Sequence, residues 1–142
     1  MSSSKKGEFL FVLRKGITLE PYLMQCNKRK LRVTTTKLRL SDHSLAIETG
    51  RRQFPKIDRE DRLCQICNKK FIEDEKHFLL TCQHYSDVRD AFLDQIFTSY
   101  PNTKRLSPDD LLQFMFLCED QETINNLLKF IGQITDIRQK HQ

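Results

Sequence analysis

The chain has little glycine and no long apolar run, and each shortage excludes a class of protein. Only 4 of its 142 residues are glycine, and no glycine-rich loop of the kind that cradles phosphates is present. No run of about 18 apolar residues occurs, so we expect no transmembrane helix and no membrane partner. The sequence also has no His-Glu-x-x-His motif. Glycine-loop phosphate binding, helical membrane spans and that class of metalloprotease are therefore excluded.

The N-terminus lacks the features of a secretory signal. Its apolar run, Phe9–Leu13, spans only five residues, and no small-residue cleavage site follows it. The chain has 5 cysteines, an odd number, and three of them cluster at metal-ligand spacing. Both facts favour a reducing compartment over a disulfide framework, so we expect an intracellular protein, nuclear or cytoplasmic.

Charge is unevenly distributed along the chain. Residues 1–70 carry 17 Lys and Arg against 7 Asp and Glu, a net charge of +10. Residues 71–142 carry 7 against 12, a net charge of −5. A basic half suggests a polyanionic partner such as nucleic acid, although two solvated faces that attract each other would give the same totals.

One constellation dominates the sequence: Cys64, Cys67, His77 and Cys82, in the spacing Cys-x2-Cys-x9-His-x4-Cys. Two thiolates in a tight turn can converge at about 2.3 Å from zinc, and three thiolates with one imidazole complete a closed tetrahedral shell. These soft donors suit Zn²⁺ better than they suit hard cations. The sequence therefore predicts a structural zinc site.

The shell would carry a net charge of −1, which nearby cations could offset. The basic residues closest in sequence are Arg62, Lys69, Lys70 and Lys76. The competing interpretation of Cys64 and Cys67, a redox dithiol, requires a βαβ context that is not found here. His84 is a rival to His77 as the fourth ligand, and we favour His77.

The metal-binding segment predicts a turn followed by a short helix. Residues 63–72 are expected to form a tight turn with a short hairpin or extended stretch, and the acidic run from Glu73 to Glu75 fits a first helical turn. Cys82 follows His77 by five positions, which in an α-helix places the two side chains about 140° apart. We therefore expect the helix to break between them.

The rest of the chain is mostly helical in pattern. Pro21 is expected to start a short helix, and Lys28–Leu40 fits either a helix or a strand, since its three threonines are β-branched. Ser41 and Asp42 form an N-cap pair for a helix that would end at Gly50. Further helices are predicted over residues 84–100, from Ser107 as N-cap, and from about Glu122. The predicted fold is a mainly α-helical small domain around a zinc-bound Cys-Cys-His-Cys turn or hairpin, with a helical C-terminal tail.

A longer string of residues surrounds these ligands in a recognisable order. It comprises Leu31-Arg32, Thr36 to Leu40, His43-Ser-Leu45, Ile47-Glu48-x-Gly50-Arg51, Ile57-x-Arg59, Arg62-Leu-Cys64-x-x-Cys67, Ile72-Glu-Asp-Glu-x-His77-Phe-Leu-Leu-x-Cys82 and Tyr85-x-x-Val-Arg89. This string resembles the zinc-binding region near the C-terminus of LINE-type (non-LTR) retrotransposon reverse transcriptases. The likeness covers about residues 22–92.

The resemblance implies a module that handles RNA or DNA during target-primed reverse transcription. The family's ligands fall on Cys64, Cys67, His77 and Cys82. It also suggests three regions: an N-terminal lead over 1–21, partly disordered; a zinc-binding reverse-transcriptase-like region over 22–100; and a C-terminal helical pair over 101–142. The polymerase does not carry over, because the chain has no Phe/Tyr-x-Asp-Asp motif. The chain is expected to be a detached C-terminal piece of such a protein.

These patterns leave three hypotheses, none of them catalytic, because a closed zinc shell has no open position for substrate. The first is binding of RNA or single-stranded DNA through phosphate contacts. The residues expected to make those contacts are Arg29, Lys30, Arg32, Lys37, Arg39, Arg51, Arg52, Arg59 and Arg62. The second is a zinc-stapled scaffold for a protein partner, in which such arginines pair with internal carboxylates. The third is a retroelement fragment without a selected function. Any oligomeric state is compatible with these hypotheses.

Overall fold

The structure is a computed structural model that describes residues 28–141. The helix expected at Pro21 and the predicted lead over residues 1–21 lie outside the described residues. Within them, five α-helices follow one another: α3 (Arg29–Arg39), α4 (Ala46–Arg52), α5 (Ser86–Ser99), α6 (Pro108–Leu117) and α7 (Gln121–His141). Short 3₁₀ segments lie at Arg59–Asp61, Gln83–Tyr85 and Pro101–Arg105, and a π-helical turn spans His77–Thr81.

Helices dominate the part of the chain that the structure describes, which confirms the mainly α fold. The only β pairing among residues 28–141 is an isolated antiparallel bridge between Leu63 and Ile72. No helix of this region is long and apolar enough to cross a membrane. The short pairing nevertheless matters, because it builds the turn that carries the first two cysteines.

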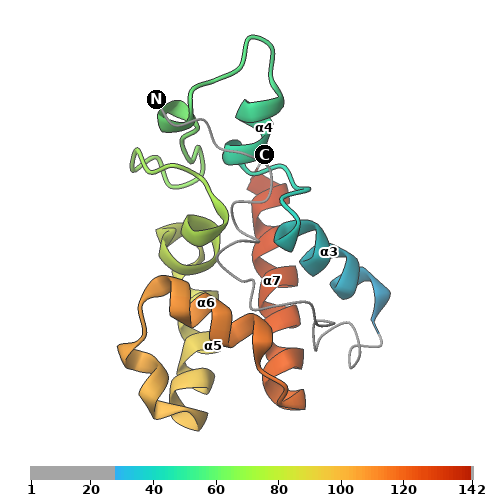
Figure 1. Ribbon diagram of the computed structural model, residues 1–142, viewed down its shortest axis with the longest axis vertical. Coiled ribbons are helices and arrows are strands. Elements are labelled where there is room, and N and C mark those ends of the chain that lie inside the picture. Colours follow the sequence, from blue (N-terminus) through green and yellow to red (C-terminus); the bar gives the residue numbers. More distant parts are fainter. Residues whose placement is uncertain (1–27, 142) are drawn as a thin grey trace.

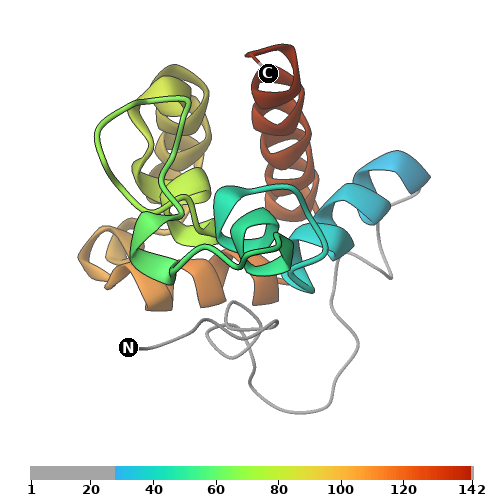
Figure 2. The ribbon, with the colours of Figure 1, turned by 90° about the horizontal axis from the view of Figure 1, so that it is seen from above.

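Helix α7 is the central element of the fold. It contacts α3 along one side and α5 and α6 along another, so that α3 and α5 flank it from opposite directions (Figures 1 and 2). Leu127, Ile131 and Ile134 are at most 1% exposed, as expected for a helix covered on several sides. The ring of Phe130 stacks on that of Phe92 in α5, with 4.7 Å between the centroids. The sequence prediction of a long amphipathic helix from about Glu122 is confirmed.

The segment that fitted either a helix or a strand is helical. In α3, the Thr34 hydroxyl donates to the Lys30 carbonyl at 2.9 Å, while Thr35 is fully buried. The helix lies close to α7 because Gly132 has no side chain. A Cβ at that position would come within 2.9 Å of the Leu31 Cδ2 atom. Tertiary packing thus outweighs the modest helix penalty of the threonines.

The expected helix from Ser41 to Gly50 is wrong at both ends. Ser41 has a positive φ of 59° and closes α3: its N–H donates to the Leu38 carbonyl, and the Asp42 N–H donates to the Lys37 carbonyl. This pair of bonds is the Schellman motif that ends helices, usually with glycine at the position of Ser41. The following helix, α4, begins only at Ala46 and continues through Gly50 to Arg52.

Gly50 therefore has a packing role rather than a capping role. A Cβ at residue 50 would lie 2.7 Å from Cγ and 3.0 Å from Cδ of Arg62, whose side chain crosses the helix at this point. The Arg62 guanidinium donates to the carbonyls of Ile57 and Ile47, at 2.9 and 3.1 Å. The glycine lets one buried arginine join α4 to the segment that leads into the metal-binding turn.

The C-terminal helices start as predicted. The Ser107 hydroxyl accepts a hydrogen bond from the Asp110 N–H at 3.2 Å, and Pro108 occupies the first helical position of α6. The boundary near residue 100 between the zinc-binding region and the C-terminal helices stays a prediction, although α7 contacts α3 as well as α5.

Candidate metal centre

A short hairpin carries Cys64 and Cys67. The Cys64 N–H donates to the Phe71 carbonyl at 2.8 Å, and the Glu73 N–H donates to the Arg62 carbonyl at 2.9 Å. These two bonds flank the Leu63–Ile72 bridge and bring residues 62–64 against residues 71–73. The connecting turn contains positive φ angles at Asn68 and Lys70. The expected turn with a short hairpin is present.

A π-helical turn carries His77 and delivers Cys82. The His77 N–H donates to the Asp74 carboxylate at 2.8 Å, which satisfies a backbone donor at the start of the turn. The Cys82 N–H donates to the His77 carbonyl at 2.7 Å, five residues back, which is the bonding pattern of a π turn. The wider turn takes more residues per revolution than an α-helix, so Cys82 comes round closer to His77. The chain then becomes extended at Cys82, where the predicted break occurs.

These two elements bring all four predicted ligands together. The three Sγ atoms and one imidazole nitrogen lie within 4.8 Å of one another. Cys67 Sγ is 3.5 Å from His77 Nε2. Around one zinc with ordinary bond lengths, tetrahedral geometry places sulfur and nitrogen about 3.6 Å apart and two sulfurs about 3.8 Å apart. The donor atoms are therefore close to the separations that a single ion requires, and the cluster could bind a metal ion.

Hydrogen bonding orients the imidazole for this role. His77 Nδ1 lies 3.0 Å from the Thr81 hydroxyl oxygen, and that hydroxyl donates to the His77 carbonyl. The oxygen is thus left to accept the Nδ1 proton, so Nε2 presents its lone pair towards Cys67. Partners of this kind fix the tautomer of metal-binding histidines.

His84 does not belong to the cluster. Its side chain is exposed, and its ring contacts those of Tyr85 and His141, at centroid distances of 5.2 and 4.9 Å. The group that could hold a metal contains His77 and not His84. Of the two histidines that the sequence left as alternatives, the structure brings only His77 to the three sulfurs.

Burial shifts the pKa values of three of the four ligands, Cys64, His77 and Cys82, in the direction that favours the neutral form of each side chain. It raises the pKa of Cys82 to about 12 and also raises the pKa of Cys64. Burial likewise lowers the pKa of His77. At neutral pH, and without an ion, Cys64 and Cys82 are thus neutral thiols and His77 is a neutral imidazole. A bound cation would favour the thiolate forms, so metal binding is expected to release protons.

The cations expected from the sequence to offset the charge of the cluster lie in different environments, and two of them, Lys70 and Lys76, line a pocket together with His77. Arg62 is used between α4 and the hairpin, Lys76 pairs with Asp109, and Lys69 and Lys70 are exposed. Two buried arginines also lie beside the cluster. One is Arg89 of α5, which donates to the carbonyls of Leu79 and Phe78 in the π turn, at 2.9 and 3.4 Å.

The second is Arg138 of α7, which forms a bidentate ion pair with Glu73 of the hairpin. Its Nε and Nη2 atoms each lie 2.8 Å from one carboxylate oxygen, and both residues are buried. Arg138 also donates to the Ser44 carbonyl at 3.0 Å. The Glu73 carboxylate accepts the Ala46 N–H at 2.8 Å and lies 3.9 Å from Cys64 Sγ. Glu73 thus connects a ligand thiol to α4 and α7.

The structure separates the nine predicted nucleic-acid contacts into different environments. Arg39 and Arg62 are buried, at 7% and 2% exposure, so both are removed from the candidate surface. Arg51 forms an ion pair with Glu48 at 2.8 Å, and Arg59 lies 4.0 Å from an Asp74 oxygen. Arg32 is half-buried. The exposed members are Arg29, Lys30, Lys37 and Arg52.

Comparison with protein-family models, with curated proteins and with solved structures yields no match to this chain. The Cys₃His cluster and the surface around α3 are therefore the observations from which a function can be argued.

Proposed function

We propose that the chain is a zinc-stapled module that binds nucleic acid, RNA or single-stranded DNA, and performs no catalysis of its own. The observation that carries the proposal is the convergence of Cys64, Cys67, His77 and Cys82 from two separate elements. Three sulfurs and one imidazole nitrogen match the ligand preference of zinc, whereas magnesium and calcium take oxygen ligands.

The ion would act as a crosslink between the hairpin and the π turn. Four protein ligands fill a tetrahedral shell, and binding energy at such a site becomes folding energy. The crosslink would extend beyond the turn, because Glu73 contacts both the start of α4 and Arg138 on α7. A metal bound by the cluster would in this way support the position of the helices that display the basic side chains.

Charge supports nucleic acid as the partner. The basic half of the chain supplies the exposed cations of α3 and Arg52 at the end of α4. Lysine and arginine side chains that replace counterions on phosphates give binding that weakens steeply with salt and depends little on sequence. Origin from the C-terminal region of a LINE-type reverse transcriptase forms part of this proposal, supported by the residues that flank the four ligands.

The test combines metal analysis with salt-titrated binding. We expect about one zinc per chain, and binding of a labelled RNA or single-stranded DNA that falls steeply as salt rises. Removing the zinc with a chelator should weaken binding and lower the melting temperature together. A purified chain that holds no metal, or that binds none of these strands even at low salt, would contradict the proposal.

A second candidate is a protein-interaction scaffold, which the internal pairing of arginines favours. Arg51 and Arg59 contact Glu48 and Asp74, as the scaffold hypothesis expects. The stripe of Phe114, Phe116 and Leu117 on α6 would favour a protein partner if it were exposed. It gives little support, because Phe116 is 2% exposed and the other two are half-buried. A chain that binds zinc but neither RNA nor DNA would favour this candidate.

A further inference from the structure

A polar groove runs between α3 and α7. Two adjoining cavities, of about 450 and 250 Å³, share Thr34 on α3 with Thr135 and Gln139 on α7. The larger cavity reaches the end of α4, where Arg52 lines it, and the smaller one extends to Lys129 on α7. The shared residues make the two cavities one continuous depression along the helix pair.

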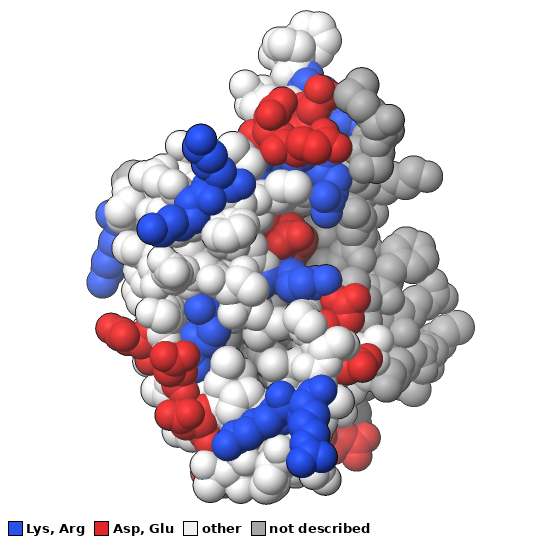
Figure 3. Space-filling view, turned by 90° about the vertical axis from the view of Figure 1, so that its left-hand side faces the viewer, with Lys and Arg blue, Asp and Glu red and all other residues white. Residues whose placement is uncertain are grey.

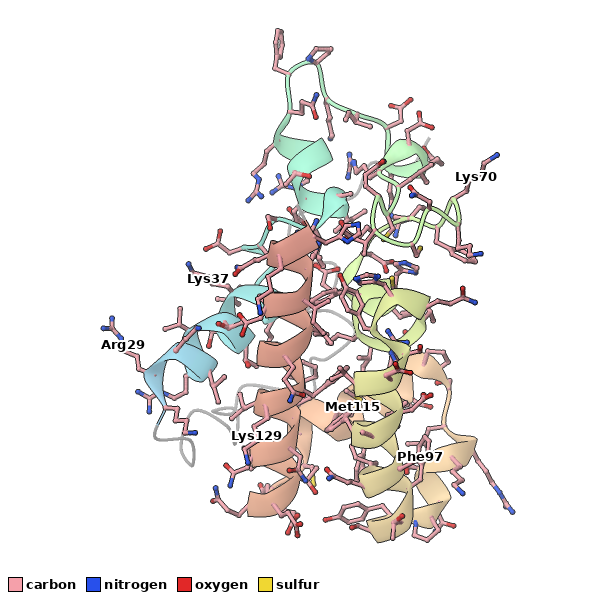
Figure 4. The ribbon with its side chains drawn as sticks, turned by 180° about the vertical axis from the view of Figure 1, so that it is seen from behind. Arg29, Lys37, Lys70, Phe97, Met115 and Lys129 are labelled. Atoms are coloured by element: carbon pink, nitrogen blue, oxygen red, sulfur yellow. The ribbon has the colours of Figure 1, made fainter. Side chains whose placement is uncertain are left out.

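Cations line the groove from three different helices. Lys30 and Lys37 on α3 follow the i and i+7 positions of one helical stripe, with Thr34 between them. Lys129 adds a positive charge from α7, and Arg52 adds one from α4. In Figure 4, the labelled Arg29 and Lys37 project from α3 and Lys129 projects from the neighbouring α7.

The three lysines of the groove remain available to a ligand, whereas Arg52 Nη2 donates to the His43 carbonyl at 2.6 Å. No ion pair joins Lys30, Lys37 or Lys129 to a carboxylate of residues 28–141. Arg138 also lines the groove, but it is paired with Glu73. The other four cations outnumber the two carboxylates of the lining, Asp42 and Asp136. Uncharged donors lie between the charges: Thr34, Ser44, Gln133, Thr135 and Gln139.

The face formed by the hairpin, α5 and α6 has a different character. Separate groups of basic and of acidic side chains alternate over that face, and neither sign covers it (Figure 3). A polyanion would meet repulsive as well as attractive charges on that face. The groove between α3 and α7 is therefore the better binding site for a chain of phosphates.

An exposed aromatic residue follows, two positions along the chain, the arginine that lines one end of the groove. Phe54 is 98% exposed and follows Arg52 by two residues, in the loop that projects at the top of Figure 1. Its Cα lies within about 7 Å of that of Arg52, the span of two extended residues. An aromatic face next to a cationic groove is the combination by which proteins bind unpaired bases, because every base can stack on a ring.

We infer that the groove between α3 and α7 holds a single strand of nucleic acid, whose phosphates contact Lys30, Lys37, Lys129 and Arg52 while an unpaired base stacks on Phe54. This inference rests on the proposed function and adds the site and the strandedness of the ligand. Duplex is disfavoured, because a paired base is stacked within its own helix and cannot cover the Phe54 ring.

The first test compares two variants of the full zinc-loaded chain that carry the same change in charge. One is Lys30→Gln/Lys37→Gln/Lys129→Gln, and its control is Lys104→Gln/Arg105→Gln/Lys140→Gln, all exposed positions outside the groove. With a fluorescent 20-nucleotide RNA and the matching single-stranded DNA, we expect the groove variant to lose at least tenfold in affinity. Its salt slope should fall by about 2, since each phosphate contact contributes about 0.7 on a single strand. The control should bind nearly as the unmodified chain does.

The second test uses Phe54→Ala. Loss of base stacking should weaken single-strand binding by about tenfold while leaving the salt slope unchanged, because no phosphate contact is removed. Zinc content and the circular dichroism spectrum should match those of the unmodified chain. Phe54→Tyr, which keeps an aromatic face, should retain most of the affinity.

Each remaining result has a defined meaning. Equal losses in the groove variant and its control, a duplex bound as tightly as a single strand, or an unaffected Phe54→Ala variant would each overturn the inference while leaving nucleic-acid binding itself in place. No binding by the unmodified chain would instead overturn the proposed function. These failures are therefore distinguishable.

Discussion

The pair formed by Glu73 and Arg138 makes the sharpest prediction about stability. Arg138→Met removes the guanidinium that contacts both oxygens of a buried carboxylate at 2.8 Å. Removing one partner of a buried ion pair costs about 3–5 kcal/mol, because the remaining charge stays buried without compensation. For a domain of this size, with a urea dependence of about 2 kcal/mol per M, the unfolding midpoint should fall by about 2 M.

The same substitution should also weaken metal binding. Glu73 lies 3.9 Å from Cys64 Sγ, so a thiolate bound to the metal would face a carboxylate at that distance. At an effective dielectric constant of about 20, two like charges so placed repel by about 4 kcal/mol, and Arg138 offsets this repulsion. We expect the zinc affinity of Arg138→Met to fall by about 10- to 100-fold, the range seen when partners of metal ligands are removed.

A double substitution separates this explanation from a general loss of packing. Glu73→Gln/Arg138→Met removes both charges, keeps an oxygen that can accept the Ala46 N–H, and should recover much of the stability and zinc affinity. Lys140→Met, an exposed position two residues further along α7, serves as the control and should change neither quantity. Urea unfolding with zinc present and competition with a chelating dye measure both. A cost below about 1 kcal/mol for Arg138→Met, or a double variant as damaged as the sum of its single variants, would refute the reasoning.

Three further predictions concern the ligands and their supports. His77→Gln should lower zinc affinity at least tenfold in a chelator competition, while His84→Gln should bind normally; the reverse result would reassign the fourth ligand. Gly50→Ala should cost about 1–3 kcal/mol in urea unfolding, since the new Cβ meets the buried Arg62 side chain at 2.7 Å, and a neutral effect would show that Arg62 moves freely. In the metal-free chain, burial raises the pKa of Cys82 from 9.0 to about 12. Between these pH values the folded chain keeps the Cys82 proton that the unfolded chain loses, so the contribution of the neutral thiol to stability is complete below pH 9 and is lost as pH rises towards 12. The free energy of unfolding, measured with a chelator present, should therefore fall over that range, and Cys82→Ala should reduce the fall.

Much of the metal centre could be predicted from local sequence. The four ligands follow from donor type and spacing, because a turn of a few residues can bring two thiols to one ion whatever surrounds it. The start of α6 was also local information, since Ser107 and Pro108 supply the cap and the first helical residue themselves. Helix α7 could also be predicted locally, because the helical spacing of its apolar residues is a property of the sequence and does not depend on which elements pack against it.

Other features depended on contacts between distant parts of the chain. Glu73 and Arg138 are 65 residues apart, and no local pattern links an acidic residue of the hairpin to an arginine near the end of the last helix. Ser41 looked like a helix start, yet the backbone turned left-handed there and closed α3 instead. Lys129, on the acidic half of the chain, was not among the predicted contacts, and only the packing of α3 on α7 placed it beside the basic helix.

The sequence by itself determined which four side chains can share a metal and where the long helices run, because donor chemistry and helical periodicity act over a few residues. Only the tertiary structure decided which charges are buried and which remain on the surface. Burial depends on which elements meet, so it moved Arg39 and Arg62 into the interior and left Lys30 and Lys37 along a groove. The identity of the cations beside the metal centre was decided in the same way, by the helices that pack against it.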